Sequence, residues 1–348
     1  MIAQASTKDI WTVKYRPSRL EELVGNEESA NTLHRLALSR NVPHLLLYGP
    51  ANSGKATAAF ALAYELYGEG FERNFTYFNS SDFFDKGKSY LVRDKRFTRI
   101  LGTDDPRKVQ KSVISVFKEI INEYASMAPI DSDYKIIFID SSETLDVNAQ
   151  HALRRMMEKY TATCRFILST TQPSRLISPL RSRGLQLFFR HVSDEKLENF
   201  IKRISEAEGV LVTEDGIQAL LYHSRGNVAS SLDTLQVAVI LSDGGPIGTQ
   251  AIYDAVIREE IPEIQLLFEA FMAGNIIEAR KIIDRMLIDN GFTGSEILER
   301  FHRTMVASGE PEHRIARWTI KVADANFKML QAANDRIQLE ALAADFCN

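Results

Sequence analysis

The chain contains a short glycine-rich stretch whose residue types and spacing suit phosphate binding. Residues 48–59 read YGPANSGKATAA, in which Gly49, Gly54 and Lys55 complete the pattern G-x-x-x-x-G-K. In such a loop, backbone N–H groups and the start of a helix face the phosphates, and the lysine reaches the terminal ones. The predicted loop also includes Pro50, Asn52, Ser53, Ala56 and Thr57.

The residue after the lysine departs from the pattern. It is Ala56, where a Ser or Thr is expected. That hydroxyl is normally a ligand of Mg²⁺, so capture of the metal should be impaired. Thr57 is not expected to replace it, because one step along a helix rotates the side chain by roughly 100°. The loop therefore predicts a bound nucleotide, ATP or ADP, with a weakened magnesium site.

A second acidic position belongs with this loop. Asp140 ends the apolar run YKIIFID (134–140), where nucleotide-hydrolysing enzymes hold Mg²⁺ through water. Such enzymes usually place a Glu directly afterwards to activate the attacking water. Here that position is Ser141, and Glu143 is expected to point elsewhere. A helix N-cap or a turn acid is the alternative interpretation of Asp140.

These residues require a parallel sheet to position them. Short apolar runs indicate buried strands, and helical spacing of apolar residues indicates helices between them. Strands alternating with helices predict a right-handed parallel sheet with ligands at the strand C-termini. The expected strands are 43–49, 134–140 and 165–171, and the expected helices are 55–67 (closing at Gly68), 109–124 and 149–160. The polar stretch 83–107 is expected to be a surface insertion, and almost everything after residue 191 reads as helix.

Composition limits the classes of function. With 348 residues and a net charge of −4, the chain has no global positive field, so any nucleic-acid surface must be a local patch. Cys164 and Cys347 lie far apart, and the seven histidines have no ligand spacing, so neither a disulfide framework nor a metal site is predicted. No secretory pattern occurs in MIAQASTKDI, and no apolar run approaches the ~20 residues of a membrane span. An intracellular protein without a membrane partner is expected.

Five motifs occur in order: WTVKYRP (11–17), LVGNE (23–27), HLLLYGP…SGK, AQHALRRMMEKY (149–160) and SPLRSRG (178–184). Together they resemble the small subunits of replication factor C clamp loaders, AAA+ proteins of eukaryotic and archaeal DNA replication. The resemblance implies an α/β fold in three parts. An AAA+ parallel-sheet nucleotide-binding domain (1–191, with the insertion about 83–107) precedes a helical lid domain (192–245) and an all-helical collar domain (249–348), which the chain matches only in helical character and length.

The resemblance implies roles around the nucleotide. The family's sensor-1 Asn falls on Thr171 and its sensor-2 Arg on Ala229. With Ala56 and Ser141 these make four departures in one site. Loss of one preorganised electrostatic group commonly costs 10²–10³ in rate, so hydrolysis in this chain's own site is not expected. The adenine pocket is implied to be lined by Tyr15, Arg16, Pro17 and Val24, and Asp140 matches the family's metal-site aspartate.

The resemblance also implies roles for residues that contact a neighbouring subunit or DNA. Arg183 in SRG (182–184) matches the arginine that reaches the γ-phosphate of the adjacent subunit, which can be worth 10³–10⁵ in turnover. Gly184 replaces the family's cysteine; a surface arginine after a turn is the alternative. Lys118 and Arg154 match positions near DNA, and Lys111 is expected on the same helix as Lys118, two turns away. Phosphate contacts need only charge on a common face, although a solvated face is equally consistent.

The sequence therefore predicts a hetero-oligomeric clamp-loader subunit, in a pentamer by resemblance, that helps open a sliding clamp and load it on primer–template DNA. The departures and the insertion at 83–107 resemble the eukaryotic subunit at the end of the arc, whose own site is degenerate. Two alternatives stay open: an active DNA-stimulated ATPase subunit, and an interaction-only adaptor of an alternative loader. The expected compartment is the cytoplasm or nucleoid of an archaeon, or the nucleus of a eukaryote.

Overall fold

The computed structural model describes residues 10–347, apart from 85–86, 104, 260–261, 330–331 and 333. Residues 1–9, where no targeting segment is expected, lie outside the described part. The contacts within the chain divide it into two compact units, residues 1–249 and 250–348. Each unit has its own core.

A parallel sheet forms the centre of the first unit, as the sequence predicts. In the described part of the chain it has five strands in the order β2-β3-β4-β1-β5. Their bounds are β1 Leu45–Tyr48, β2 Phe75–Asn79, β3 Lys135–Asp140, β4 Cys164–Thr170 and β5 Leu185–Phe188. Tyr48 pairs with Thr170 on one side and Phe188 on the other. The carboxyl ends of the strands therefore meet at one edge, where ligands of such sheets bind.

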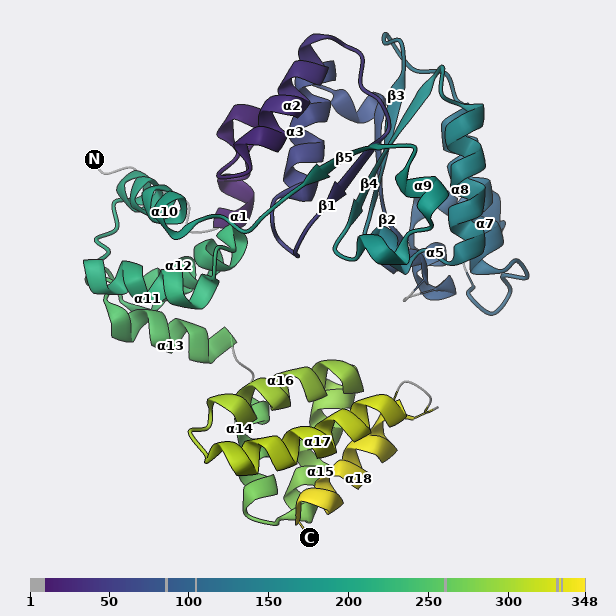
Figure 1. Cartoon of the computed structure of the whole chain (residues 1–348). Helices are drawn as coiled ribbons and strands as arrows, with labels where there is room; N and C mark the ends of the chain where they lie inside the picture. The colour runs from purple at the N-terminus through teal and green to yellow at the C-terminus, as the bar shows by residue number, and fades with distance from the viewer. Residues whose placement is uncertain are drawn as a thin grey trace. The chain divides into compact units, whose positions relative to one another are not determined.

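Helices cover both faces of this sheet (Figure 1). Alternate strand residues point to opposite faces, so Leu45 and Leu47 join one core while Leu46 joins the other. The first core is covered by α2 (Glu27–Leu38) and α3 (Lys55–Tyr67), and the second by α7 (Val113–Ser126) and α8 (Val147–Lys159). Strands β1, β3 and β4 are buried on both faces, which explains why their sequences are largely apolar.

The segment expected to be a surface insertion is instead anchored in a core. It contains the short helices α4 (Ser80–Phe84), α5 (Lys88–Arg93), η3 (Lys95–Phe97) and α6 (Thr98–Leu101). Phe83, Leu91 and Phe97 are fully buried, and the rings of Phe83 and Phe97 lie 5.5 Å apart. Charged residues such as Arg93, Asp94 and Arg96 lie between these anchors in the sequence, which explains why the segment reads as polar and weakly periodic.

Three helices follow the sheet within the first unit: α10 (Asp194–Glu208), α11 (Glu214–Ser224) and α12 (Val228–Leu241). The N-terminal helix α1 (Trp11–Lys14) packs on α12, and the Trp11 backbone N–H donates to Gln236 Oε1 at 3.0 Å. We call α10–α12 the lid helices. The remaining short elements are η1 (Leu20–Glu22), η2 (Phe71–Arg73), η4 (Ser142–Thr144), η5 (Pro173–Arg175) and α9 (Ser178–Arg181).

The second unit is helical, as predicted for a collar. Its core gathers apolar side chains such as Phe268, Phe301 and Trp318. No helix in the described ranges has the length and apolar character of a membrane span. The helices are α13 (Thr249–Glu259), α14 (Pro262–Met272), α15 (Ile276–Asp284), the π-helical η6 (Arg285–Asp289), α16 (Gly294–Ala307), α17 (Glu312–Met329) and α18 (Asp335–Cys347).

Candidate nucleotide-binding site

A cavity of about 390 Å³ opens at the carboxyl edge of the sheet, between the glycine-rich loop and the lid helices. It brings together most of the residues that the sequence assigned to nucleotide binding. Those lining it are Tyr15, Arg16, Pro17, Val24, Asn52, Ser53, Gly54, Lys55, Ala56, Thr57 and Asp140. Gly49 and Pro50 are not among the lining residues, but their carbonyls hold the lysine.

The loop adopts a conformation that requires its glycines. Gly49 has φ +147°, and a Cβ built there would lie 2.0 Å from the Phe189 carbonyl oxygen, so no other residue fits. Gly54 has φ +90° and caps the N-terminus of α3, and Asn52 also has a positive φ of 55°. Helix α3 runs from Lys55 to Tyr67, as predicted. The local glycines therefore place a helix N-terminus, with its free N–H groups, beside the cavity.

Lys55 is buried and held by its own loop. Its Nζ donates to the carbonyls of Pro50 at 2.5 Å and Gly49 at 3.0 Å, and to Ser53 Oγ at 3.3 Å. Burial lowers the pKa of Lys55, although the nearby carboxylates of Asp140 and Glu143 act in the opposite direction. A phosphate at this position would give the buried ammonium a charged partner.

Glu143 lines this cavity, which contradicts the expectation that it points elsewhere. Ser141 adopts a left-handed conformation with φ 51°, and the short helix η4 that follows turns Glu143 toward Thr171. The Thr171 hydroxyl donates to Glu143 at 2.6 Å, and the Thr171 N–H donates at 3.3 Å. Burial raises the pKa of Glu143, but these hydrogen bonds outweigh it and the pKa lies below its usual value. The carboxylate is therefore held ionised inside the site.

The four departures named from the sequence lie around the same cavity. Ala56, Ser141, Thr171 and Ala229 all line it. The site thus has carboxylates at Asp140 and Glu143 but no hydroxyl at position 56. Within the described ranges, no group of three or more acidic, histidine or cysteine side chains could hold a metal ion.

The strip 15–17 is tied to the lid helices. The Tyr15 hydroxyl donates to Glu208 near the end of α10, and Lys14 Nζ donates to the same carboxylate at 2.7 Å. Burial raises the pKa of the Tyr15 phenol, and the Glu208 carboxylate raises it further. This wall of the cavity is therefore fixed to α10.

Several lining residues were not predicted from the sequence. They belong to the N-terminal segment, the glycine-rich loop, the end of β4, the segment before α10 and the lid helices, and all are apolar residues or alcohols, whose types carry no signal for nucleotide binding. They are Thr12, Leu23, Ala51, Ser169, Thr170, Val192, Phe200, Val228 and Leu232.

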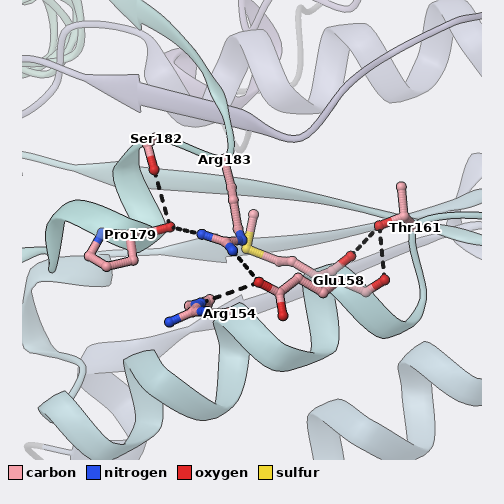
Figure 2. A network of polar contacts seen from close by, with 7 residues as sticks. Arg154, Glu158, Thr161, Pro179, Ser182 and Arg183 are labelled. Atoms are coloured by element: carbon pink, nitrogen blue, oxygen red, sulfur yellow. Dashed lines mark hydrogen bonds and ion pairs between the residues drawn. The ribbon is translucent and has the colours of Figure 1, made fainter.

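Arg183 belongs to a separate polar network (Figure 2). Its guanidinium donates to Glu158 on α8 and to the Pro179 carbonyl at 2.6 Å, and its side chain is 29% exposed. Arg154 donates to the same Glu158 carboxylate at 3.3 Å. Gln150, which is buried, also joins α8 to this region, because its amide bonds the backbone of Arg175 and Ile177. The segment 175–183 is therefore held firmly against α8.

The three residues predicted to contact DNA do not share one helix face. Helix α7 begins at Val113, because the Ser112 hydroxyl caps it by accepting from the Ser115 N–H. Lys111 precedes this cap, so the expectation that it lies on the helix with Lys118 is wrong. Lys111 is paired with Glu119 at 2.6 Å. Lys118 lies half-exposed on α7, and Arg154 lies on α8, which packs against α7.

Comparisons with known proteins agree with this architecture. The family described as "ATPase family associated with various cellular activities (AAA)" matches residues 45–211, and "Replication factor C C-terminal domain" matches residues 257–345. The "Replication factor C small subunit" of Archaeoglobus fulgidus is 34% identical over 97% of this chain and 96% of its own length. The proteins of that name from Methanocella arvoryzae and Natronomonas pharaonis are 34% and 31% identical, over 97% and 98% of this chain and 96% of each relative.

Among solved structures, the RuvB Holliday junction branch migration motor of Thermotoga maritima matches with a TM-score of 0.51. It is 18% identical and covers 82% of this chain and 84% of its own, so it supports the fold alone. The sequence relatives extend over almost the whole chain and include both the sheet and the helical second unit. The chain therefore belongs to the replication factor C small-subunit family of AAA ATPases.

Proposed function

We propose that this chain is a clamp-loader subunit that binds ATP or ADP in its own site without hydrolysing it and supplies Arg183 to the ATP of a neighbouring subunit. One observation carries the proposal: the four departures from the family pattern line a single cavity, while Arg183 is not among its lining residues and lies just after the end of α9. A subunit that catalyses only in trans can lose the catalytic groups of its own site, but it must retain the arginine that acts on the neighbouring site.

The cavity retains the features that bind phosphates. The start of α3 offers free N–H groups, Lys55 supplies a buried positive charge, and the strip 15–17 closes the opposite wall. The features that assist hydrolysis are weaker. Position 56 offers no metal ligand, and Ala229 offers no cation to a γ-phosphate. When bound, Mg²⁺ would neutralise phosphate charge, and Asp140 and Glu143 are the carboxylates available to hold it.

Arg183 suits a role in trans. A guanidinium has five N–H donors, and the contacts with Glu158 and Pro179 use two of them. The ion pair is partly exposed, so a phosphate can compete with it at small cost. Arginine is always charged and binds phosphate oxygens in a bidentate way, which a neighbouring site would use to stabilise the transition state.

The wider role follows from the relatives' printed name and from charge. We infer assembly with other loader subunits through the second unit, and contact with a sliding clamp and with primer–template DNA. Lys118 on α7 is the first candidate for DNA-backbone contact, whereas Lys111 and Arg154 are weaker candidates because Glu119 and Glu158 pair with them. The domain limits 1–191, 192–245 and 249–348 remain part of this proposal.

The cis half of the proposal is tested on the isolated chain. We expect equilibrium binding of ADP and ATP that Lys55→Ala weakens by about tenfold or more, because the phosphates lose a charged partner. No hydrolysis above background is expected with or without Mg²⁺. Hydrolysis that both Lys55→Ala and Glu143→Gln abolish would contradict this half.

That outcome would instead establish a second candidate, an active ATPase in which Glu143 replaces the missing water activator. The observation favouring it is that Glu143 is held ionised within the cavity. A carboxylate in that state can act as a general base.

The trans half is tested in a loader reconstituted with its partner subunits. Arg183→Ala should lower ATP turnover and clamp loading on primer–template DNA. Arg175→Ala is the matched control, because Arg175 is also an exposed arginine on the segment leading to α9. Equal activity of the two variants would favour the interaction-only adaptor.

A further inference from the structure

Asn26 joins the phosphate loop to the segment that carries the lid helices. It precedes α2 in a left-handed conformation, with φ 57° and ψ 34°. Its Oδ1 accepts from the Arg190 N–H at 2.7 Å, and its Nδ2 donates to the Arg190 carbonyl at 3.0 Å and the Ser53 carbonyl at 3.2 Å. An amide has two donor hydrogens, so both bonds form together, and the partners fix which way the amide points.

On the loop side, Asn26 donates to the carbonyl of Ser53, a residue whose hydroxyl contacts Lys55. The Ser53 hydroxyl accepts from Lys55 Nζ at 3.3 Å and donates to the Pro50 carbonyl at 2.8 Å. A phosphate in the loop would draw Lys55 away from these oxygens, because a charge-assisted bond is stronger than a bond to a carbonyl. Phosphate binding would therefore change the contacts of Ser53, the residue whose carbonyl accepts from Asn26.

On the far side, the segment 188–192 connects β5 to the lid helices. The Phe189 N–H donates to the Tyr48 carbonyl at 2.8 Å, which fixes the start of the segment to β1. The Val192 N–H donates to the Gly226 carbonyl at 3.0 Å, and a Cβ at Gly226 would lie 2.4 Å from the Val192 carbonyl oxygen. Val192 thus rests directly against the turn that starts α12.

Helix α12 completes the path back to the cavity. The Asn227 side chain caps it by accepting from the Ser230 N–H, and Val228, Ala229 and Leu232 line the cavity. A displacement of 190–192 would therefore move the lid wall of the nucleotide site.

We propose that Asn26 is a positioning residue that couples occupancy of the phosphate loop to the position of the lid helices. When nucleotide binding changes the contacts of Lys55 and Ser53, the Asn26 amide shifts with them. That shift displaces Arg190 and Val192, and Val192 in turn displaces the start of α12. Because such coupling is reciprocal, ordering of the lid tightens nucleotide binding by the same factor. The inference rests on the proposed binding of nucleotide.

Two variants separate this role from simple stability. Asn26→Gly removes the amide while tolerating the positive φ, so it adds no backbone strain. Asn26→Asp keeps the acceptor for the Arg190 N–H but places acceptor oxygens against two carbonyls. Ser29→Ala is the matched control, because the Ser29 hydroxyl donates to the Phe188 carbonyl at 2.9 Å and so anchors the same segment without touching the loop.

The test is amide hydrogen exchange of the full chain with and without saturating ADP. In the wild type and in Ser29→Ala, ADP should slow exchange in both the loop (49–57) and the start of α12 (226–235), by about fivefold or more. In both Asn26 variants, ADP should still protect the loop, while its effect on 226–235 falls below about twofold.

Full ADP-dependent protection of 226–235 in the Asn26 variants would overturn the inference. A merely structural role would speed exchange equally with and without ADP, and would overturn it too. If ADP does not protect the loop of the wild type, the proposed nucleotide site fails and this inference fails with it. Loop protection thus distinguishes the two failures.

Discussion

Replacement of Phe97 by alanine tests whether the segment 83–107 is built into the core. Phe97 is fully buried, and its ring lies 5.5 Å from that of Phe83 and 6.3 Å from that of Tyr90. The Arg96 guanidinium also lies 5.3 Å from the Phe97 ring centroid. Truncation of such a ring removes its burial and leaves a cavity, which costs about 3–5 kcal/mol.

The expected shift in melting temperature follows from the size of the unit. One kcal/mol corresponds to about 2–4 °C in a domain of 150–250 residues, so Phe97→Ala should lower the melting temperature of the first unit by about 6–20 °C. Differential scanning calorimetry measures this directly. Phe327→Ala is the control, because Phe327 lies on α17 with 62% of its area exposed and should leave that transition unchanged. A shift below 2 °C for Phe97→Ala would refute the assignment of this segment to the core.

Three further predictions concern the site and its supports. Gly49→Ala should destabilise the first unit by about 3 kcal/mol or more and abolish nucleotide binding, because its Cβ would meet the Phe189 carbonyl oxygen; nucleotide affinity equal to that of the wild type would contradict this. Glu158→Gln should change ATP turnover of the reconstituted loader by less than about fivefold, since partly exposed ion pairs contribute little, and a loss as large as that of Arg183→Ala would show that Glu158 is required. Burial lowers the pKa of His44 from 6.5 to about 4, so between these pH values the unfolded chain binds more protons than the folded chain. The free energy of unfolding therefore has its full value above pH 6.5 and falls by up to about 3 kcal/mol as the pH falls to 4. His44→Asn keeps an acceptor for the Phe166 N–H and should flatten this dependence in urea titrations, whereas an unchanged pH slope would refute the assignment.

The parts of the fold that the sequence predicted are those with local signals. Helix α3 has Gly54 at its start and Gly68, with φ +68°, at its end. The buried strands β1, β3 and β4 each contain a continuous apolar run, LLL, IIFI and FIL respectively. Strand β5 was not predicted, because three of its four side chains are exposed and its sequence LQLF has no pattern to distinguish it.

The errors have equally local causes. Glu143 was expected to leave the site, but Ser141 takes a left-handed conformation that is uncommon for a residue other than glycine, and this turns the chain back. Lys111 was placed on a helix because the helix was expected to begin at Val109, whereas the Ser112 hydroxyl caps a helix that begins at Val113. The conformation of Ser141 cannot be read from its residue type, whereas a serine before an apolar run favours a helix N-cap, so Ser112 was an available signal for the start of α7.

The hydrogen-bond partners of Asn26 could not be predicted from the sequence either. The motif LVGNE marks the residue, but its partners Ser53 and Arg190 lie 27 and 164 positions away in the chain. Only the fold brings them together.

The most direct test of the proposed catalysis in trans is single-turnover ATP hydrolysis in a minimal assembly of this chain with the partner subunit whose site Arg183 is proposed to complete. Arg183→Ala should slow hydrolysis at that site by about 10³-fold or more, while Lys55→Ala, which is expected to disable only this chain's own site, should leave the rate unchanged. The account is contradicted if Arg183→Ala hydrolyses ATP at the wild-type rate, or if Lys55→Ala removes the hydrolysis.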